Sequence, residues 1–325
     1  MKTYRWFSAV LVLVMVLVGC TPSTPVSQRV INVGMLLARG GLGDRSFNDS
    51  AYEGLLEAQR QYGIRFETVD FASDEVSEEA IRRFAEQNYD LLIGVGFENI
   101  PFIQAAARDY PDMNLAMIDA VVEGDNVASV IYREPEGDFL MGVLAVMLTE
   151  SGTVGFIGGA DIDVIRRIEA GFKQGVAYQD ADVVVLAELA GTFSEPDIGR
   201  EIALEQYAAG ADVIYNAAGR TGLGIIEAAR EAGQLTIGTS GDQRYLAPGH
   251  VVGNRPKRVD TAVVILVEEV LQDRFAPGVR SLGLQEAGLS IGPFDDNLVT
   301  PDMLRTLDDL KARIIAGEIQ VVTGD

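Results

Sequence analysis

The chain is poor in the side chains on which hydrolases and disulfide-rich secreted proteins depend. Its 325 residues include one cysteine, Cys20, and one histidine, His250. These numbers exclude a disulfide within the chain and a zinc site of the His/Cys type. His250 follows a Pro-Gly turn and reads either as a turn residue or as a catalytic base. Since nothing in the pattern of the 48 acidic residues selects a catalytic pair, we expect neither an enzyme nor a cofactor or metal site.

Positive charge is also scarce. Lysine and arginine number 26 against 48 aspartate and glutamate residues, which gives a net charge of −22. A surface this acidic repels nucleic acid and anionic lipid headgroups, so we exclude both as partners. Outside residues 7–18, no apolar stretch is long enough to cross a bilayer. We therefore expect the chain to meet a membrane only through its N-terminus.

The N-terminus has the pattern of a bacterial lipoprotein signal. Lys2 and Arg5 precede the apolar residues 7–18, and the run ends in Leu17-Val-Gly-Cys20, which resembles a lipobox. We expect residues 1–19 to be a signal peptide, Cys20 to carry acyl chains, and residues 20–28 to form a tether. The alternatives are an ordinary signal peptide with a chance cysteine and an uncleaved anchor. All three place the working domain outside the cytoplasmic membrane.

From residue 30 onward, short apolar runs alternate with amphipathic segments. This alternation is typical of parallel sheets covered by helices on both faces. The expected strands are 30–37, 65–70, 91–95, 114–118, 127–132, 153–157, 183–186, 212–216, 235–238 and 250–253. The expected helices are 48–62, 77–88, 99–109, 136–149, 163–178, 198–209, 222–232, 259–273 and 301–316. Two sheets of about five strands suit this length better than one sheet of ten.

The α/β pattern therefore predicts two lobes with Rossmann-like parallel sheets. The first break is expected near residues 132–135, where Pro135 interrupts the pattern, and further crossings near residues 253–256 and after Pro277. These three crossovers divide the chain into lobe 1, residues 29–132 plus 254–279, and lobe 2, residues 133–253 plus 280–325.

The first glycine-rich loop, GGLGDRSFNDS, lies between an expected strand and an expected helix. Ligands bind at such places in open α/β sheets. Gly41-Leu-Gly43-Asp-Arg-Ser46 mimics a dinucleotide fingerprint, with Asp70 as the ribose acid, but nicotinamide cofactors are scarce outside the cell. Phe47 reads either as a platform on which a ring stacks or as a hydrophobic staple of the helix. Ser46 is expected to cap that helix.

A second glycine-rich loop, AAGRTGLG, follows the strand expected at 212–216. Two such loops, one per lobe, would face each other across a cleft. Asp119 and Asp242 follow other expected strands, and Phe193 lies in another loop. A planar ligand between two aromatic rings, with acids around a polyol, would use all of these features.

Several motifs, in their order along the chain, resemble the basic membrane protein family of bacterial lipoproteins. They are GDRSFNDSAYEGL, AMIDA, IGGADIDVIRRIEAGFKQGV, GADVIYNAAGRTGLG, IGTSGDQ and PKRVD. The resemblance spans essentially the whole chain after the signal. It implies the type I periplasmic-binding fold, a monomer, and a ligand between the lobes. Known members capture purine nucleosides and deliver them to an ABC permease, whose ATPase lies in the cytoplasm.

The resemblance also implies roles for individual residues. Phe47 and Phe193 would sandwich the base, and Asn48 would bind its edge. The residues around the ribose would be Asp119, Gly219, Asp242 and Lys257. The neighbouring Asp44, Ser46, Thr221 and Ser240 complete the expected ligand-binding set.

Two departures affect the expected ligand. Family members commonly have an acid where this chain has Ala38 and another where it has Ser240. Losing carboxylate acceptors would retune the site toward a different base, sugar or modified nucleoside. The predicted function is a lipid-anchored solute-binding protein of an ABC importer. The alternatives are a ligand-sensing lipoprotein or adhesin of the same fold, and an extracytoplasmic nucleoside-processing enzyme.

Overall fold

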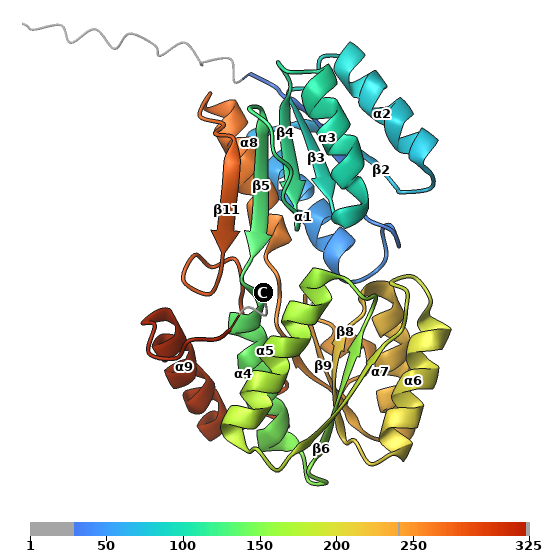
Figure 1. The fold of residues 1–325 in the computed structure, drawn as a ribbon, viewed down its shortest axis with the longest axis vertical. Helices are drawn as coiled ribbons and strands as arrows, with labels where there is room; N and C mark the ends of the chain where they lie inside the picture. The colour runs from blue at the N-terminus through green and yellow to red at the C-terminus, as the bar shows by residue number, and fades with distance from the viewer. Residues whose placement is uncertain (1–28, 240, 323–325) are drawn as a thin grey trace, which may run out of the picture.

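The computed structural model describes residues 29–239 and 241–322. The expected signal peptide, Cys20, the whole tether and Ser240 lie outside the described residues. Two parallel sheets form two lobes, shown one above the other in Figure 1, so the predicted α/β fold is confirmed. In the described part of the chain, no helix is both long and apolar enough to cross a bilayer.

The upper lobe in Figure 1 contains six parallel strands in the order β11-β5-β4-β3-β1-β2. The inner strand β3 (Leu91–Val95) is fully buried, as expected for a strand covered on both faces, whereas the edge strand β2 carries Arg65 and Glu67. The other strands are β1 (Asn32–Leu36), β2 (Arg65–Val69), β4 (Asn114–Ile118), β5 (Val127–Tyr132) and β11 (Gly278–Leu282). The helices are α1 (Phe47–Tyr62), α2 (Asp74–Glu86), α3 (Ile100–Asp109) and α8 (Val259–Leu271).

The lower lobe contains five parallel strands in the order β10-β9-β8-β6-β7. Helices α4 and α5 approach closely because Gly175 faces the other backbone, where a Cβ would lie 1.9 Å from the carbonyl oxygen of Phe139. The strands are β6 (Thr153–Gly158), β7 (Val184–Leu189), β8 (Val213–Ala217), β9 (Leu235–Gly238) and β10 (Val251–Asn254). The helices are α4 (Glu134–Leu148), α5 (Asp163–Gln179), α6 (Pro196–Ala208), α7 (Gly222–Ala232) and α9 (Pro301–Ile315).

The chain passes between the two sheets after Tyr132, after Asn254 and after Leu282. The last crossing corrects the expected boundary at residue 279, because β11 pairs with β5 through Leu282. This strand was not predicted. Its sequence, GVRSL, lies at a sheet edge with mostly exposed side chains and has no apolar run to reveal it.

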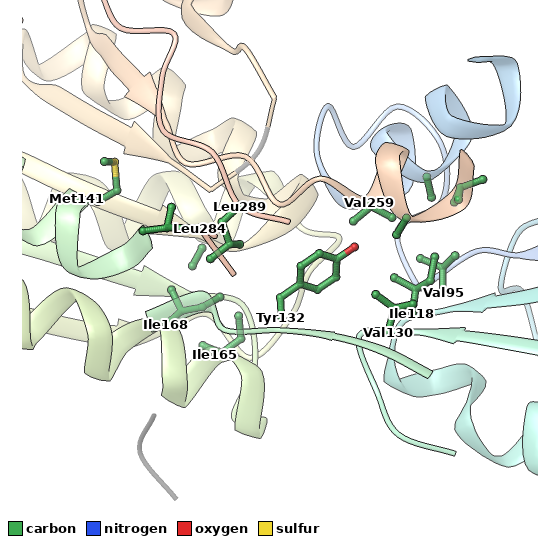
Figure 2. Packing of buried hydrophobic residues seen from close by; sticks show 14 of the residues in the cluster. Val95, Ile118, Val130, Tyr132, Met141, Ile165, Ile168, Val259, Leu284 and Leu289 are labelled. Carbon is green, nitrogen blue, oxygen red and sulfur yellow. The ribbon is translucent and has the colours of Figure 1, made fainter. Parts of the chain in front are cut away.

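One buried hydrophobic cluster continues through the crossings from one lobe into the other. Figure 2 shows Tyr132 between Ile118 and Val130 of the upper lobe and Leu284 and Leu289 of the third crossing. The Tyr132 side chain is 3% exposed, and its hydroxyl donates a hydrogen bond to the carbonyl oxygen of Arg258, 3.4 Å away. The crossings are therefore packed as core rather than as exposed linkers.

Candidate ligand-binding cleft

A cleft of about 910 Å³, part of it open to solvent, lies between the lobes. Parallel strands of both sheets end at it, and the loops that follow these strands form its walls. Eight of the residues predicted to bind ligand line this cleft: Asp44, Ser46, Phe47, Asn48, Asp119, Phe193, Gly219 and Lys257.

The first glycine-rich loop is held by Asp44 rather than by the expected helix cap. Ser46 is the N-cap residue of α1, but its side chain makes no capping hydrogen bond. Instead, the Asp44 carboxylate accepts from the backbone N–H groups of Ser46, Asn48 and Asp49 at 2.8, 2.9 and 3.1 Å. Burial raises the pKa of Asp44, and these three hydrogen bonds partly oppose the shift. The carboxylate thus stabilises the positive end of α1.

Asn48 ties the loop to the end of β1. Its side-chain oxygen accepts from the backbone N–H of Ala38 at 2.9 Å, and the residue is 2% exposed. The amide nitrogen has no hydrogen-bond partner among the described residues and is available at the cleft. Beneath the loop, the buried Asn99 amide donates to the carbonyl oxygens of Leu36 and Val95, which holds the ends of β1 and β3 together.

The ring of Phe193 lies on bare backbone in the lower lobe. A Cβ on Gly159 would lie 2.2 Å from the Phe193 Cε1 atom, so only glycine leaves room for the ring there. A Cβ on Gly219 would lie 3.4 Å from Cδ1. The carbonyl oxygen of Phe193 accepts from the N–H of Thr221 at 3.2 Å. These contacts fix the loop that carries the second aromatic ring.

Thr221 itself is not a lining residue. It is fully buried, and its hydroxyl donates to the carbonyl oxygen of Thr192 and accepts from the N–H of Glu195. The prediction that it contacts ligand is therefore corrected: Thr221 supports the Phe193 loop from behind.

Lys257 joins both lobes at the hinge side of the cleft. Its ammonium lies 2.7 Å from Asp119, at the end of β4, and 2.9 Å from Glu134, at the start of α4. It also lies 5.6 Å from the centroid of the Phe47 ring and 5.2 Å from that of Tyr132. Asp119 has a left-handed backbone, with φ of +73°.

Charge pairing favours the charged forms of Lys257 and Glu134, whereas burial raises the pKa of the Asp119 carboxyl even though Lys257 partly opposes the shift. Burial disfavours the charged form of Lys257, but the two carboxylates outweigh it and raise the pKa of the ammonium. Burial likewise opposes ionisation of Glu134, but Lys257 and Arg167 together lower the pKa of its carboxyl.

Asp242 does not reach the cleft. Its side chain is 44% exposed and pairs with Arg244, whose guanidinium donates at 2.9 Å and lowers the pKa of the carboxyl. The carboxylate pairs with Arg244 at the surface and is not among the lining residues, and its ribose contact stays a prediction. Ser240 lies outside the described residues.

Several lining residues had not been predicted. Ile162, Val164, Ile165 and Ile168, at the start of α5, form an apolar wall, and Phe97 and Glu98 follow β3. The spacing of the isoleucines is that of any core-facing helix stripe, so the sequence alone could not single them out. Arg39, Arg220 and Arg255 also line the cleft.

A second contact joins the two lobes. The Gln243 amide donates to the carbonyl oxygen of Arg45, 3.0 Å away, and its oxygen accepts from Asn254 at 3.2 Å. Gln243 is 3% exposed. It therefore links the loop before α1 to the end of β10, where the chain crosses between the lobes.

Comparison with known proteins identifies the family to which the chain belongs. The sequence profile of the family described as ABC transporter substrate-binding protein PnrA-like matches residues 31–323. The chain belongs to this family. It is 28% identical to basic membrane protein A of Borreliella burgdorferi, over 94% of this chain and 92% of that protein. It is 31% identical to an uncharacterized lipoprotein of Pyrococcus furiosus, over 85% and 74%.

Solved structures agree with this assignment. An ABC transporter solute-binding protein from Aeropyrum pernix superposes with a TM-score of 0.82 at 29% identity, covering 90% of this chain and 93% of the other. A transcriptional activator of the comK gene from Bacillus halodurans gives 0.78 at 20% identity, covering 89% and 99%, which shows the shared fold alone. The chain is therefore an ABC transporter substrate-binding protein by family and by fold.

Proposed function

We propose that this substrate-binding protein is anchored to the cell membrane through a lipid on Cys20 and captures a purine nucleoside for an ABC permease. The observation that carries the ligand class is the position of two phenyl rings. Phe47 comes from the upper lobe and Phe193 from the lower lobe, and both line one cleft. Rings supplied by opposite lobes suit a flat ligand that is stacked on both faces when the lobes close.

Polar groups around the rings suit the rest of a nucleoside. Asn48 directly follows Phe47 in the sequence. Its amide nitrogen, which has no hydrogen-bond partner among the described residues, can donate to the edge of a base. Asp119 and Lys257 lie beside the Phe47 ring, at the hinge, and offer an acceptor and a donor for sugar hydroxyls. Asp242 is left out of this site. Thr221 acts through the Phe193 loop.

The proposed anchor rests on the lipobox-like sequence and on relatives that are named lipoproteins. Mass spectrometry of the N-terminal peptide from a membrane fraction tests it. We expect acyl groups on Cys20 in the wild type and release of the Cys20→Ser variant from membranes. An unmodified cysteine in the membrane fraction would contradict the anchor.

Calorimetric titration tests the ligand. The chain from residue 21 is unfolded and refolded to remove bound ligand, then titrated with adenosine, guanosine, inosine, cytidine and ribose. We expect saturable binding of a purine nucleoside and none of ribose. Phe47→Ala should weaken this binding by about 1–3 kcal/mol, the usual value of a stacked ring. If the folded protein bound none of these five compounds, the nucleoside proposal would be refuted and the family assignment would stand.

A further inference from the structure

Two guanidinium groups line the cleft with donors that the contacts proposed above leave unused. The first belongs to Arg255, which is fully buried. Its Nε donates to Asp138 Oδ1 at 2.7 Å, and its Nη2 lies 2.6 Å from the same oxygen. Nη1 has no hydrogen-bond partner among the described residues; Nη2, close to Oδ1 as an ion pair, makes no hydrogen bond of good geometry there, and Asp138 Oδ2 is likewise without a partner. One side of this guanidinium is thus fixed, while Nη1 lacks an acceptor.

The position of Arg255 is built into the lower lobe. Its stem lies on Gly137 of α4, where a Cβ would be 2.7 Å from Arg255 Cδ. Tyr215, on β8, also donates to the Asp138 carboxylate. Asp138 and Gly137 of α4 and Tyr215 of β8 therefore fix the position of the guanidinium.

The second group belongs to Arg220, in the short 3₁₀ helix Gly219–Thr221 that follows β8. Its side chain forms no ion pair or hydrogen bond with residues 29–239 or 241–322. The lining cations Lys257 and Arg39 differ from it, because Lys257 is paired with two carboxylates and the Arg39 guanidinium lies 4.8 Å over the Phe71 ring.

The lining acids Asp44 and Asp119 are already engaged, and the third, Glu98, follows β3 in the upper lobe and interacts with Arg39. Asp44 accepts three backbone hydrogen bonds and Asp119 is paired with Lys257. Arg220 and Arg255 follow β8 and β10, two strands of one parallel sheet with only β9 between them, so both lie at the same edge of the lower lobe. A buried donor without an acceptor is unfavourable, and guanidinium groups fit the oxygens of phosphate.

We propose that the ligand carries a phosphate monoester, bound by Arg220 and by Nη1 of Arg255, so that a nucleoside monophosphate is preferred over the free nucleoside. This inference rests on the proposed nucleoside site. It places the phosphate at the edge of the lower lobe, and it assigns the nucleoside itself to the two phenyl rings.

Titration of the refolded chain from residue 21 with guanosine and with guanosine 5′-monophosphate tests the inference. The monophosphate should bind at least about tenfold tighter, the value of one charge-assisted hydrogen bond. Arg220→Gln should remove this preference, so that its loss of affinity for the monophosphate is at least about tenfold larger than its loss for guanosine. Arg230→Gln removes an exposed charge of α7 outside the cleft; it is the matched control and should change the affinity for neither ligand by more than about twofold.

Arg255→Lys gives an independent check, because it keeps a positive charge beside Asp138 while removing Nη1. Circular dichroism and the melting temperature establish that this variant folds. It should weaken the monophosphate more than guanosine. Equal binding of the two ligands by wild type, or equal losses in Arg220→Gln and Arg230→Gln, would overturn the inference. Guanosine binding without monophosphate binding would refute the inference alone, whereas no binding of either would refute the proposed function as well.

Discussion

The two lobes present their halves of the cleft by different means. In the upper lobe, Phe47 is the first residue of α1, and the Asp44 carboxylate fixes that helix end through three backbone hydrogen bonds. In the lower lobe, Phe193 lies outside any helix or strand, with its ring on Gly159 and its carbonyl oxygen bonded to the N–H of Thr221. One ring is positioned by a capped helix, and the other by glycine backbone and a buried threonine.

The difference predicts how each half responds to substitution. A capped helix end tolerates loss of one acceptor at a modest cost, because the rest of the helix is held by packing. A ring lying on glycine has no room to adjust, so a single added methyl group displaces it. Where the halves meet, at Lys257, the change should be larger than in either half.

Lys257→Met should have the largest effect. It leaves Asp119 and Glu134 buried without their shared cation, which costs about 3–5 kcal/mol of unfolding free energy. Urea denaturation measures the loss. The control is Arg244→Met, which breaks the exposed pair with Asp242 and should cost no more than about 1 kcal/mol. Equal losses in the two variants would contradict the claim that the hinge cluster is the buried junction of the lobes.

The lower lobe contains a second buried ion pair, and it should give a pH dependence. Burial raises the pKa of Asp138 from 3.8 to about 6, although Arg255 and Tyr215 partly oppose the shift. The folded carboxyl therefore keeps its proton at pH values where the unfolded chain has lost it. The contribution of Asp138 to the free energy of unfolding is then fully present below about pH 4, and on the order of 3 kcal/mol of it is lost as the pH rises through about 6.

Urea denaturation at several pH values, compared between wild type and Asp138→Asn, isolates this titration. The variant cannot ionise at this position, so the stability of wild type relative to the variant should decrease between pH 4 and 6. If the free energies of unfolding of the two proteins changed in parallel with pH, Asp138 would have the same pKa in the folded and the unfolded chain.

Gly159→Ala tests the lower half of the cleft directly. The new methyl group would overlap the Phe193 ring and should lower purine-nucleoside affinity by about 1–3 kcal/mol, as Phe193→Ala should. The two substitutions together should cost no more than Phe193→Ala alone, because the methyl group acts only through the ring. Additive losses in calorimetric titrations would contradict this coupling.

The same contrast explains what the sequence could predict. The alternation of apolar runs predicted ten strands, and the glycines and polar residues before α1 predicted the Phe47 loop. Phe193 stood out only as an aromatic residue in a loop, and the family resemblance paired it with Phe47 around the base. Asp242 was predicted to contact ribose, whereas the structure pairs it at the surface with Arg244, two residues away, and the spacing of the motifs does not encode this pair.

Asp44→Ala should have the smallest effect of these changes. Removing the helix cap should cost about 0.5–2 kcal/mol of stability and weaken ligand binding through the displaced Phe47. Asp44→Asn keeps one acceptor oxygen and should recover part of the loss. If Asp44→Ala changed neither urea stability nor ligand affinity, the upper half of the cleft would not depend on its cap.

A crystal structure of the chain from residue 21 with guanosine or its monophosphate tests the central claim most directly. We expect the base between the rings of Phe47 and Phe193, with the sugar beside Asp119 and Lys257. A purine base bound elsewhere, or a cleft in which the two rings contact different parts of the ligand, would contradict it.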